Sequence, residues 1–235
     1  MANNQSSIIN HQSKMRWFRF ARWLCKVFCK SFFQIRVEGS KNVPEQGALV
    51  LICNHQSYLD PVLCGIFLKR PLYFLARDTL FANPLFGRLL ASVNTIPVKR
   101  GKADFDAIRK VIGKLKAGYG LCLFPEGTRT TDGKIAPFKP GFGLLCRRTD
   151  AAIVPVVIDG AFECWGRGKK FFTPARFTGA IARRGGKITI CYGRYISAER
   201  IKKMSDKELA GYLTEILRRM QGDSRIKQGK KPYEY

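Results

Sequence analysis

The sequence predicts an α/β fold, in which a mixed, largely parallel β-sheet is flanked by helices and preceded by a basic amphipathic helix. Three observations support this prediction. From residue 47 onward, short apolar runs alternate with helical patterns. The hydrophobic fraction of 46% is typical of a globular protein. Residues 14–33 combine bases with aromatic side chains and contain no acid. At 235 residues the chain fits one large domain with a small appendage.

The first 34 residues are expected to form a polar tail over residues 1–13 and then an amphipathic helix that binds a membrane. Five bases recur at steps of three and four and so follow one helical stripe, namely Arg16, Arg19, Arg22, Lys26 and Lys30. Trp17, Trp23 and several Phe and Leu side chains cover much of the remaining surface. This combination suits the surface of an anionic bilayer. The alternative is a core helix with a solvated basic face.

Residues 35–222 are expected to form the α/β domain. Strands are predicted at the short apolar runs, residues 48–53, 72–76, 94–98, 120–124 and 153–158. Helices are predicted between them, at residues 58–68, 84–91 and 104–117. The second of these helices opens on Asn83-Pro84, a cap followed by a proline at the first helical position.

Toward the C-terminus, Gly185-Gly186 separates residues 176–182 from residues 187–191, which predicts a hairpin or two further strands. The pattern Ser205 to Glu208 is a capping box. It predicts a helix with four apolar side chains directed inward, Leu209, Leu213, Ile216 and Met220. The basic segment 223–235 is expected to be disordered.

The charge balance limits the possible partners. A net charge of +25 and a pI near 10.1 indicate a polyanion or an anionic surface, so nucleic acid and membrane both fit. No nucleic-acid-binding module is recognisable, which favours the membrane. No uncharged apolar segment approaches the roughly 20 residues that span a bilayer, and no signal-peptide pattern opens the chain. We therefore expect peripheral or monotopic attachment.

The cysteines indicate an intracellular protein with reduced thiols. Eight cysteines include no Cys-x-x-Cys pair, and the chain has only two histidines, so no metal site is expected. Several cysteines, such as Cys53 and Cys122, lie within apolar runs, where a free thiol packs like a small hydrophobic group.

His55 and Asp60 are the predicted catalytic residues. They lie in a polar block directly after the strand 48–53, at the sheet edge where active sites of α/β proteins collect. The other histidine, His11, belongs to the polar tail. An imidazole with a pKa near ~6.5 can accept a proton near neutral pH, and a carboxylate on its other nitrogen stabilises the imidazolium. No Gly-x-Ser-x-Gly sequence is present, so the pair is expected to activate a hydroxyl of the substrate.

Two further blocks contain candidate substrate-binding residues. Glu126, Gly127, Thr128 and Arg129 follow the apolar run 120–124. Glycine allows close approach of the backbone, threonine donates a hydroxyl, arginine grips phosphate, and the glutamate can accept hydrogen bonds from a polyol. The alternative is an ion pair of Glu126 with Arg129 across a turn. Lys99 and Arg100 end another strand, either as an anion site or as a solvated strand end.

These blocks together resemble the glycerolipid acyltransferase superfamily that contains 1-acyl-glycerol-3-phosphate acyltransferases. The family's Asn-His-x4-Asp motif is matched by Asn54, His55 and Asp60, and its Phe-Pro-Glu-Gly-Thr-Arg motif is matched in full by residues 124–129. Its arginine-bearing motif is similar to residues 98–101, and its proline-centred motif to residues 154–156. The resemblance covers roughly residues 35–195. Many relatives have longer hydrophobic N-terminal segments than this chain.

The resemblance implies an enzyme of phospholipid biosynthesis, an O-acyltransferase that needs no cofactor. His55, oriented by Asp60, would activate a glycerol hydroxyl for attack on acyl-CoA or acyl-carrier protein. Lys99, Arg100 and Arg129 would hold the acceptor's phosphate, Glu126 would hold the glycerol, and N–H groups near Gly127 would hold the oxyanion. The expected acceptor is 1-acyl-sn-glycerol 3-phosphate, and the expected location is the cytoplasmic face of a membrane.

Several alternatives remain open at this point. The acceptor could be glycerol 3-phosphate or a lyso-aminolipid such as lyso-ornithine lipid. A more remote alternative is a non-catalytic basic protein that binds membrane or nucleic acid, although charge alone gives no reason for four ordered motifs.

Overall fold

The computed structural model describes residues 2–99, 104–168, 177–178, 181–182 and 185–235. Its centre is a seven-stranded sheet in the order β1-β9-β6-β2-β5-β3-β4. The strands are β1 (Phe33–Glu38), β2 (Leu49–Cys53), β3 (Leu72–Arg77), β4 (Thr95–Val98), β5 (Gly120–Leu123), β6 (Ala152–Asp159) and β9 (Gly185–Tyr192). All neighbours pair in parallel except β6 and β9, so the predicted mixed, largely parallel sheet is confirmed.

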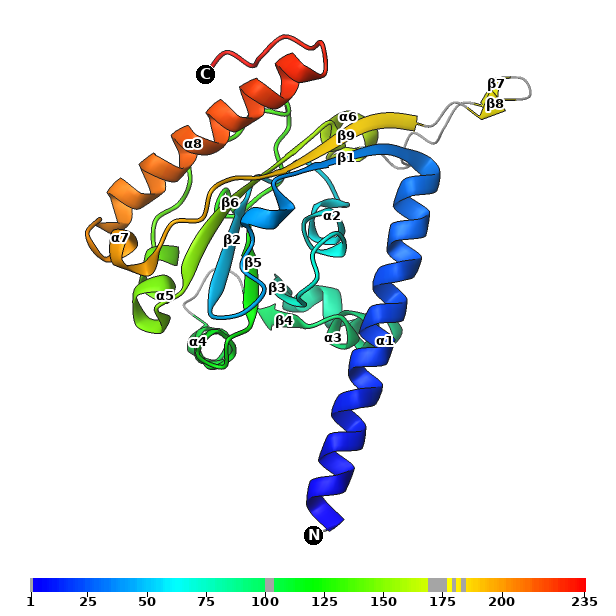
Figure 1. Cartoon of the computed structure of the whole chain (residues 1–235), viewed down its shortest axis with the longest axis vertical. Coiled ribbons are helices and arrows are strands. Elements are labelled where there is room, and N and C mark those ends of the chain that lie inside the picture. The colour runs from blue at the N-terminus through cyan, green and yellow to red at the C-terminus, as the bar shows by residue number, and fades with distance from the viewer. Residues whose placement is uncertain (1, 100–103, 169–176, 179–180, 183–184) are drawn as a thin grey trace.

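Helices cover both faces of the sheet. They are α1 (Ala2–Phe32), α2 (Asp60–Ile66), α3 (Pro84–Ser92), α4 (Phe105–Lys116), α5 (Phe142–Thr149), α6 (Ala161–Trp165), α7 (Ala198–Lys202) and α8 (Asp206–Lys227). Two single-turn helices are η1 (Ser40–Asn42) and η2 (Asp78–Phe81). Figure 1 shows α4, α5 and α8 on one side of the sheet and α1 and α2 on the other.

The apolar run of β2 forms the centre of two cores. Leu49, Leu51 and Cys53 belong to the core beneath α1 and α2, whereas Val50 and Ile52 belong to the core beneath α4 and α8. All five side chains are fully buried. A strand covered on both faces has no need for alternating polar residues, which is why the sequence here is continuously apolar.

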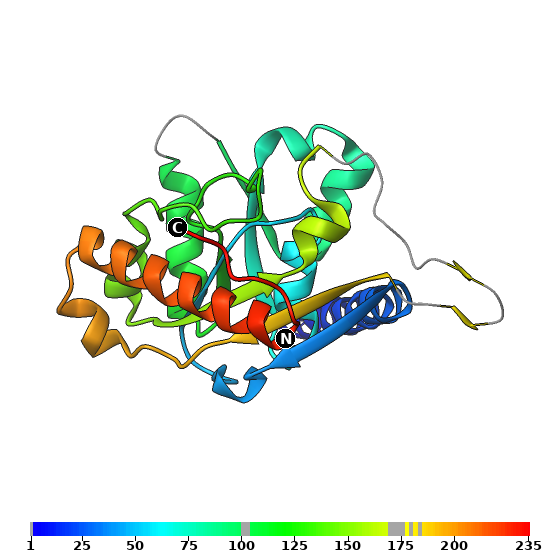
Figure 2. The same cartoon turned by 90° about the horizontal axis from the view of Figure 1, so that it is seen from above.

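The predicted elements agree with the structure to within a few residues, because each is marked by a buried apolar run or a cap. The Asn83 side chain accepts a hydrogen bond from Phe86 N–H, and Ser205 and Glu208 form the predicted capping box. Residues 177–178 (β7) and 181–182 (β8) pair as a separate small hairpin, which projects from the body in Figure 2. β9 instead joins the main sheet between β1 and β6.

The structure corrects the expectations for both ends of the chain. α1 begins at Ala2, inside the segment expected to be a polar tail. The expected disorder after residue 222 is wrong, because α8 continues to Lys227. Arg225 Nη1 lies 3.3 Å from Asp159 Oδ1, and Gln228 donates a 2.8 Å hydrogen bond to Asp159 Oδ2. Asp159 is fully buried and distant in sequence, so composition alone could not reveal that it anchors this segment.

Candidate active site

His55 and Asp60 meet at the C-terminal end of β2. His55 follows the strand by two residues, and Asp60 is the first residue of α2. His55 Nδ1 lies 2.7 Å from Asp60 Oδ2, which leaves Nε2 as the ring nitrogen able to accept a proton from a substrate. The His55 side chain is 21% exposed, whereas Asp60 is fully buried. The predicted pair is therefore in hydrogen-bonding contact, with only the imidazole accessible.

The backbone around the pair holds the carboxylate in place. Ser57 N–H donates a 2.7 Å hydrogen bond to Asp60 Oδ2, the oxygen that also faces the imidazole. Burial raises the pKa of Asp60, and the hydrogen bonds from His55 and Ser57 oppose that rise. The Phe124 ring stacks on the imidazole with centroids 4.3 Å apart, which restricts the ring to one orientation.

Glu126 joins the two sequence blocks. Register pairs Ile52 with Leu123, so the loops after β2 and β5 lie side by side. Glu126 Oε1 accepts the His55 backbone N–H at 2.6 Å, and Oε2 accepts the Ala136 N–H at 3.1 Å. Burial raises its pKa to about 7. The sequence predicted contact of Glu126 with a polyol, but did not foresee that both carboxylate oxygens hold the backbone of the site.

A cavity of about 410 Å³ opens beside Glu126. Its lining includes Thr128 and Arg129 from the same loop, and Arg167 from the segment after α6. The Arg129 guanidinium carbon lies 3.4 Å from the centroid of the Tyr58 ring, a cation–π contact that orients its N–H groups. This cavity brings together three of the predicted substrate-binding residues, Glu126, Thr128 and Arg129.

Three other predicted substrate-binding residues have different outcomes. Lys99 is exposed at the end of β4, an edge strand separated from β2 by β5 and β3, and it does not line the cavity. Arg100 lies outside the described residues. Gly127 has φ +74°, which favours glycine, and its N–H donates to Phe124 O at 3.0 Å. That N–H closes the turn, so the predicted oxyanion donor would have to be another group of the loop.

Several polar residues of the site were not assigned a role from the sequence. Asn54 exchanges two hydrogen bonds with the backbone of Ile158 and thereby ties the end of β2 to β6. The Ser57 hydroxyl donates to Trp165 O at 2.7 Å and is fully buried, which agrees with its not being a nucleophile. The polar block after β2 signalled that these residues matter, but their partners are more than 100 residues away in the chain.

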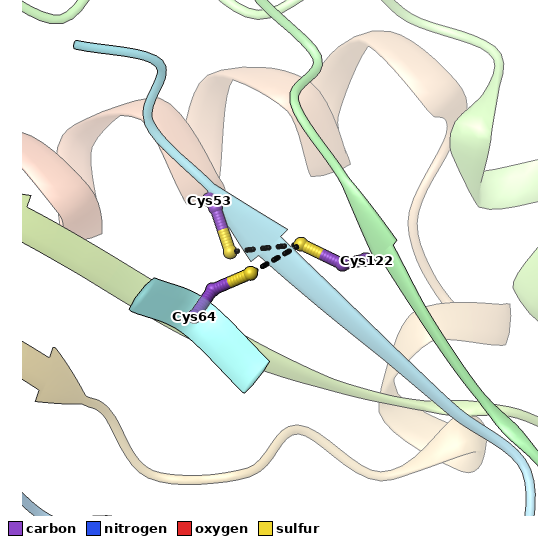
Figure 3. Close-up of side chains that lie close together, drawn as sticks. All are labelled: Cys53, Cys64 and Cys122. Carbon is purple, nitrogen blue, oxygen red and sulfur yellow. Dashed lines mark hydrogen bonds between the residues drawn. The ribbon is translucent and has the colours of Figure 1, made fainter. Parts of the chain in front are cut away.

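Three buried thiols lie close together near Asp60, and Figure 3 shows how they converge. Cys53 ends β2, Cys64 follows Asp60 by one helical turn, and Cys122 lies in β5. The Cys122 sulfur lies 3.4 Å from that of Cys53 and 3.3 Å from that of Cys64. All three could approach one cation, but burial raises their thiol pKa values well above the ordinary value and so opposes deprotonation. The arrangement packs β2 and β5 against α2.

The predicted membrane-binding residues divide between two faces of α1. Arg22 donates hydrogen bonds to Leu68 O and Lys69 O just beyond α2, and Lys26 lies over the Phe67 ring at 5.9 Å. These two bases of the predicted stripe therefore attach the helix to the domain. Arg16, Arg19 and Lys30 are exposed. The opposite face carries exposed apolar side chains, Trp17, Phe20, Trp23, Leu24, Val27 and Phe28.

Comparison with known proteins agrees with this geometry. The family model described as Acyltransferase matches residues 34–159. The chain is 31% identical over 132 residues to the chloroplastic 1-acyl-sn-glycerol-3-phosphate acyltransferase LPAT1 of Arabidopsis thaliana, covering 55% of this chain and 37% of that protein. It is 25% identical over 201 residues to the 1-acyl-sn-glycerol-3-phosphate acyltransferase of Bacillus subtilis, covering 85% of this chain and 92% of that protein. The chain thus spans little more than a third of the chloroplast relative.

A solved structure is also similar. The 1-acyl-sn-glycerophosphate acyltransferase PlsC of Thermotoga maritima superposes with a TM-score of 0.72 at 27% identity, over 90% of this chain and 81% of that one. Within the described residues, no helix has a segment long and apolar enough to cross a bilayer. The family match covers more than half of the chain and includes both His55 and Glu126, so this protein belongs to the Acyltransferase family.

Proposed function

We propose that this protein transfers a fatty acyl group from a thioester to the free hydroxyl of 1-acyl-sn-glycerol 3-phosphate, which gives phosphatidic acid. The observation that carries the proposal is the 2.7 Å contact of His55 with a buried carboxylate. The backbone of His55 is bound by Glu126, which lines a cavity together with Arg129. Relatives named as acyltransferases of this acceptor support the choice of substrate.

The reaction needs only groups of the chain and the two substrates. Nε2 of His55 removes the proton from the acceptor hydroxyl, whose oxygen attacks the thioester carbonyl carbon. The carbon–sulfur bond of the resulting tetrahedral intermediate breaks, and the imidazolium returns its proton to the departing thiolate. Asp60 stabilises the imidazolium in between. The buried, hydrogen-bonded Ser57 hydroxyl argues against a covalent acyl-serine intermediate.

Arg129 is the base expected to bind the phosphate of the acceptor. It lines the same cavity as Glu126, and its guanidinium can bind a phosphate bidentately. Glu126 retains free acceptor capacity after its two backbone hydrogen bonds, so it can also bind a glycerol hydroxyl. Glycerol 3-phosphate and lyso-aminolipids are the other acceptors to be tested, and acyl-CoA and acyl-carrier protein are both candidate donors.

We also propose that the protein binds the cytoplasmic surface of an anionic membrane through α1 and α3. Arg22 and Lys26 attach α1 to the domain, and the opposite face of the helix exposes Phe20, Trp23 and Phe28. Trp17 Nε1 donates a 3.0 Å hydrogen bond to Ser92 Oγ, which links this face to the end of α3. In α3 only Gly87 is buried, and Leu85 is 77% exposed.

The charge of the chain supports an anionic lipid surface as the partner of these side chains. Exposed bases accompany the apolar face of α1, and the chain has a net charge of +25. Near an anionic leaflet each Lys or Arg contributes about 1 kcal/mol. Aromatic side chains flanked by bases are typical of helices that lie in the membrane interface.

The test of the proposed reaction is an acceptor panel. The purified protein is incubated with acyl-CoA or acyl-carrier protein and with lysophosphatidate, glycerol 3-phosphate or lyso-ornithine lipid, and products are identified by mass spectrometry. We expect phosphatidic acid from lysophosphatidate, and no product with His55→Ala. Product formation by that variant at the wild-type rate would rule out the proposed mechanism.

A further inference from the structure

The loop over residues 130–136 contains Ala136, one of the two backbone N–H donors to Glu126. Side chains from the C-terminal part of the chain bind this loop. After α8 the chain turns back along that helix (Figures 1 and 2). Tyr235 and Glu234 reach the cavity beside Glu126 and form part of its wall. The segment that composition predicted to be disordered therefore contributes to the site.

The Gly133 carbonyl is the first attachment point of this loop. It accepts a 3.0 Å hydrogen bond from Gln221 Nε2 of α8 and another 3.0 Å hydrogen bond from Gln56 Nε2, the residue next to His55. Both glutamines are almost fully buried. Gly133 has φ +87°, and a Cβ there would lie 2.2 Å from the Tyr233 hydroxyl, so only glycine permits this close packing. One carbonyl thus connects α8 to the catalytic block.

The second attachment point is Ile135. Its N–H donates a 3.2 Å hydrogen bond to the Tyr235 hydroxyl, which in turn donates to Gln221 Oε1. Its carbonyl accepts hydrogen bonds from Arg218 Nε and Nη2 at 3.2 and 3.1 Å. The Arg218 guanidinium carbon lies 4.4 Å from the centroid of the Tyr235 ring. Both polar groups of the Ile135 backbone are therefore bound by side chains from the C-terminal part of the chain.

Ala136, the residue after Ile135, connects this loop through Glu126 to His55, the proposed catalytic base. Ala136 N–H donates to Glu126 Oε2, and Glu126 Oε1 accepts the His55 N–H. We infer that Tyr235, together with Gln221 and Arg218, is a positioning residue for acyl transfer, because it fixes the loop that orients Glu126 and through it the backbone of His55. The positioning role rests on the proposed function, but only its kinetic test requires acyl transfer.

We expect Tyr235 to shield Glu126 from water, because both line the same cavity and Glu126 is only 5% exposed. Burial is the main cause of the raised pKa of this carboxyl, and Tyr235 is part of the surrounding wall. The charged groups that face Glu126 across the cavity are Arg129, Asp132, Lys134, Arg167, Arg218 and Glu234, and Asp60 lies behind it. Removing the Tyr235 side chain would admit water without changing any of these charges. The pKa of Glu126 therefore reports whether Tyr235 shields this carboxyl, and it can be measured without an assay of acyl transfer.

The experiment uses two variants of the 235-residue chain. Tyr235→Phe keeps the ring over Arg218 but removes the hydroxyl, whereas Tyr235→Ala removes both. Tyr195→Phe is the matched control, because Tyr195 is 57% exposed and does not line the cavity. Tyr235 is itself 52% exposed, so neither substitution leaves a large core cavity and both variants are expected to fold.

For Tyr235→Phe, which loses the hydrogen bonds of the hydroxyl to Ile135 and Gln221, we expect kcat to fall about threefold to tenfold, with a smaller change in the KM of the acceptor. In Tyr235→Ala the Glu126 carboxyl, followed by carbon-13 NMR, should titrate below its wild-type value of about 7. Tyr195→Phe should match the wild type in both measurements. An unchanged Glu126 titration in Tyr235→Ala, whatever its kcat, would overturn the inference. If no thioester supports acyl transfer by the wild type, the proposed function fails while the titration still decides this point.

Discussion

His55 and Ser57 direct their N–H groups to a single oxygen of Asp60. Oδ2 lies 2.7 Å from His55 Nδ1 and 2.7 Å from Ser57 N, whereas Oδ1 is buried and has no hydrogen-bond partner among the described residues. The carboxylate therefore fixes the tautomer of the imidazole and the turn that leads into α2 at the same time. Because both hydrogen bonds go to one oxygen, an amide oxygen could accept them in its place. The effect of the charge can therefore be separated by mutation from the effect of the shape of this side chain.

Asp60→Asn tests the charge. An asparagine can place its carbonyl oxygen where Oδ2 lies and accept both hydrogen bonds, so the fold should be retained. Loss of the carboxylate removes the stabilisation of the imidazolium, and we expect kcat to fall by a factor on the order of 10²–10⁴. Steady-state kinetics and a melting curve check this prediction. A folded variant with wild-type kcat would show that the carboxylate charge is not used.

Glu126→Gln tests the buried carboxyl through the pH dependence of stability. Burial raises the pKa of Glu126 from 4.5 to about 7, so between these values the folded protein binds a proton that the unfolded chain has released. The free energy of unfolding contributed by this group therefore falls as pH rises through that window. At about 1.4 kcal/mol per pKa unit, the fall is on the order of 3 kcal/mol.

The measurement is urea unfolding of the wild type and Glu126→Gln at a series of pH values from 5 to 8. The glutamine cannot titrate, so the wild-type free energy of unfolding should fall relative to that of the variant across this range. Parallel curves would contradict a raised pKa at position 126.

Arg129→Ala tests phosphate binding. A charged hydrogen-bonding partner contributes about 1.5–3 kcal/mol, so the KM for lysophosphatidate should rise by about tenfold or more with a smaller effect on kcat. Arg129→Lys keeps the charge but loses the bidentate geometry and the stacking on Tyr58. Its KM for lysophosphatidate should therefore lie between those of the wild type and the alanine variant. Initial rates over a range of acceptor concentrations decide the matter, and an unchanged KM in the alanine variant would exclude the phosphate role.

Surface substitutions on α1 and α3 test membrane binding without disturbing buried Cys29 or Phe33. Replacing Trp23 by Ser should reduce co-sedimentation with anionic vesicles by about tenfold, since burying one large apolar side chain contributes about 1.5–3 kcal/mol. Leu85→Ser in α3 should act in the same direction. Ile226→Ser is the control, an exposed apolar side chain on α8.

Added salt distinguishes the contribution of the bases to membrane binding. Binding to anionic vesicles should weaken as ionic strength rises, because exposed charges are screened beyond about 8 Å at physiological ionic strength. Vesicle binding that is indifferent to Trp23→Ser and Leu85→Ser would place the contact elsewhere on the protein.

Cys122→Ser tests the role of the thiol group behind the site. The side chain is almost fully buried between two other sulfurs, and a hydroxyl in its place would lack a strong partner. We expect the free energy of unfolding to fall by about 1–3 kcal/mol, as for other unsatisfied buried polar groups. Cys25→Ser, at a partly exposed position in α1, should have a smaller effect. Equal stability of the two variants would argue against a packing role.

The amino-acid sequence was sufficient to predict the strands that are buried on both faces, the caps of α3 and α8, and the polar blocks after β2 and β5. These features are local, because an apolar run or a capping box is readable from a few consecutive residues. It also identified His55 and Asp60, since five residues across a turn into a helix can bring two side chains together.

The contacts between groups that are distant in the chain could not be predicted in this way. Glu126 clamps His55 to Ala136, Arg22 attaches α1 to the end of α2, and Tyr235 reaches back to Ile135. Each partner is either a backbone group, which every residue carries, or a side chain far away in the chain. Composition therefore marked the last residues as disordered and all five α1 bases as one membrane-binding stripe. The physical reason is that burial and hydrogen-bond pairing depend on the packing of the sheet and its helices, which no local pattern encodes.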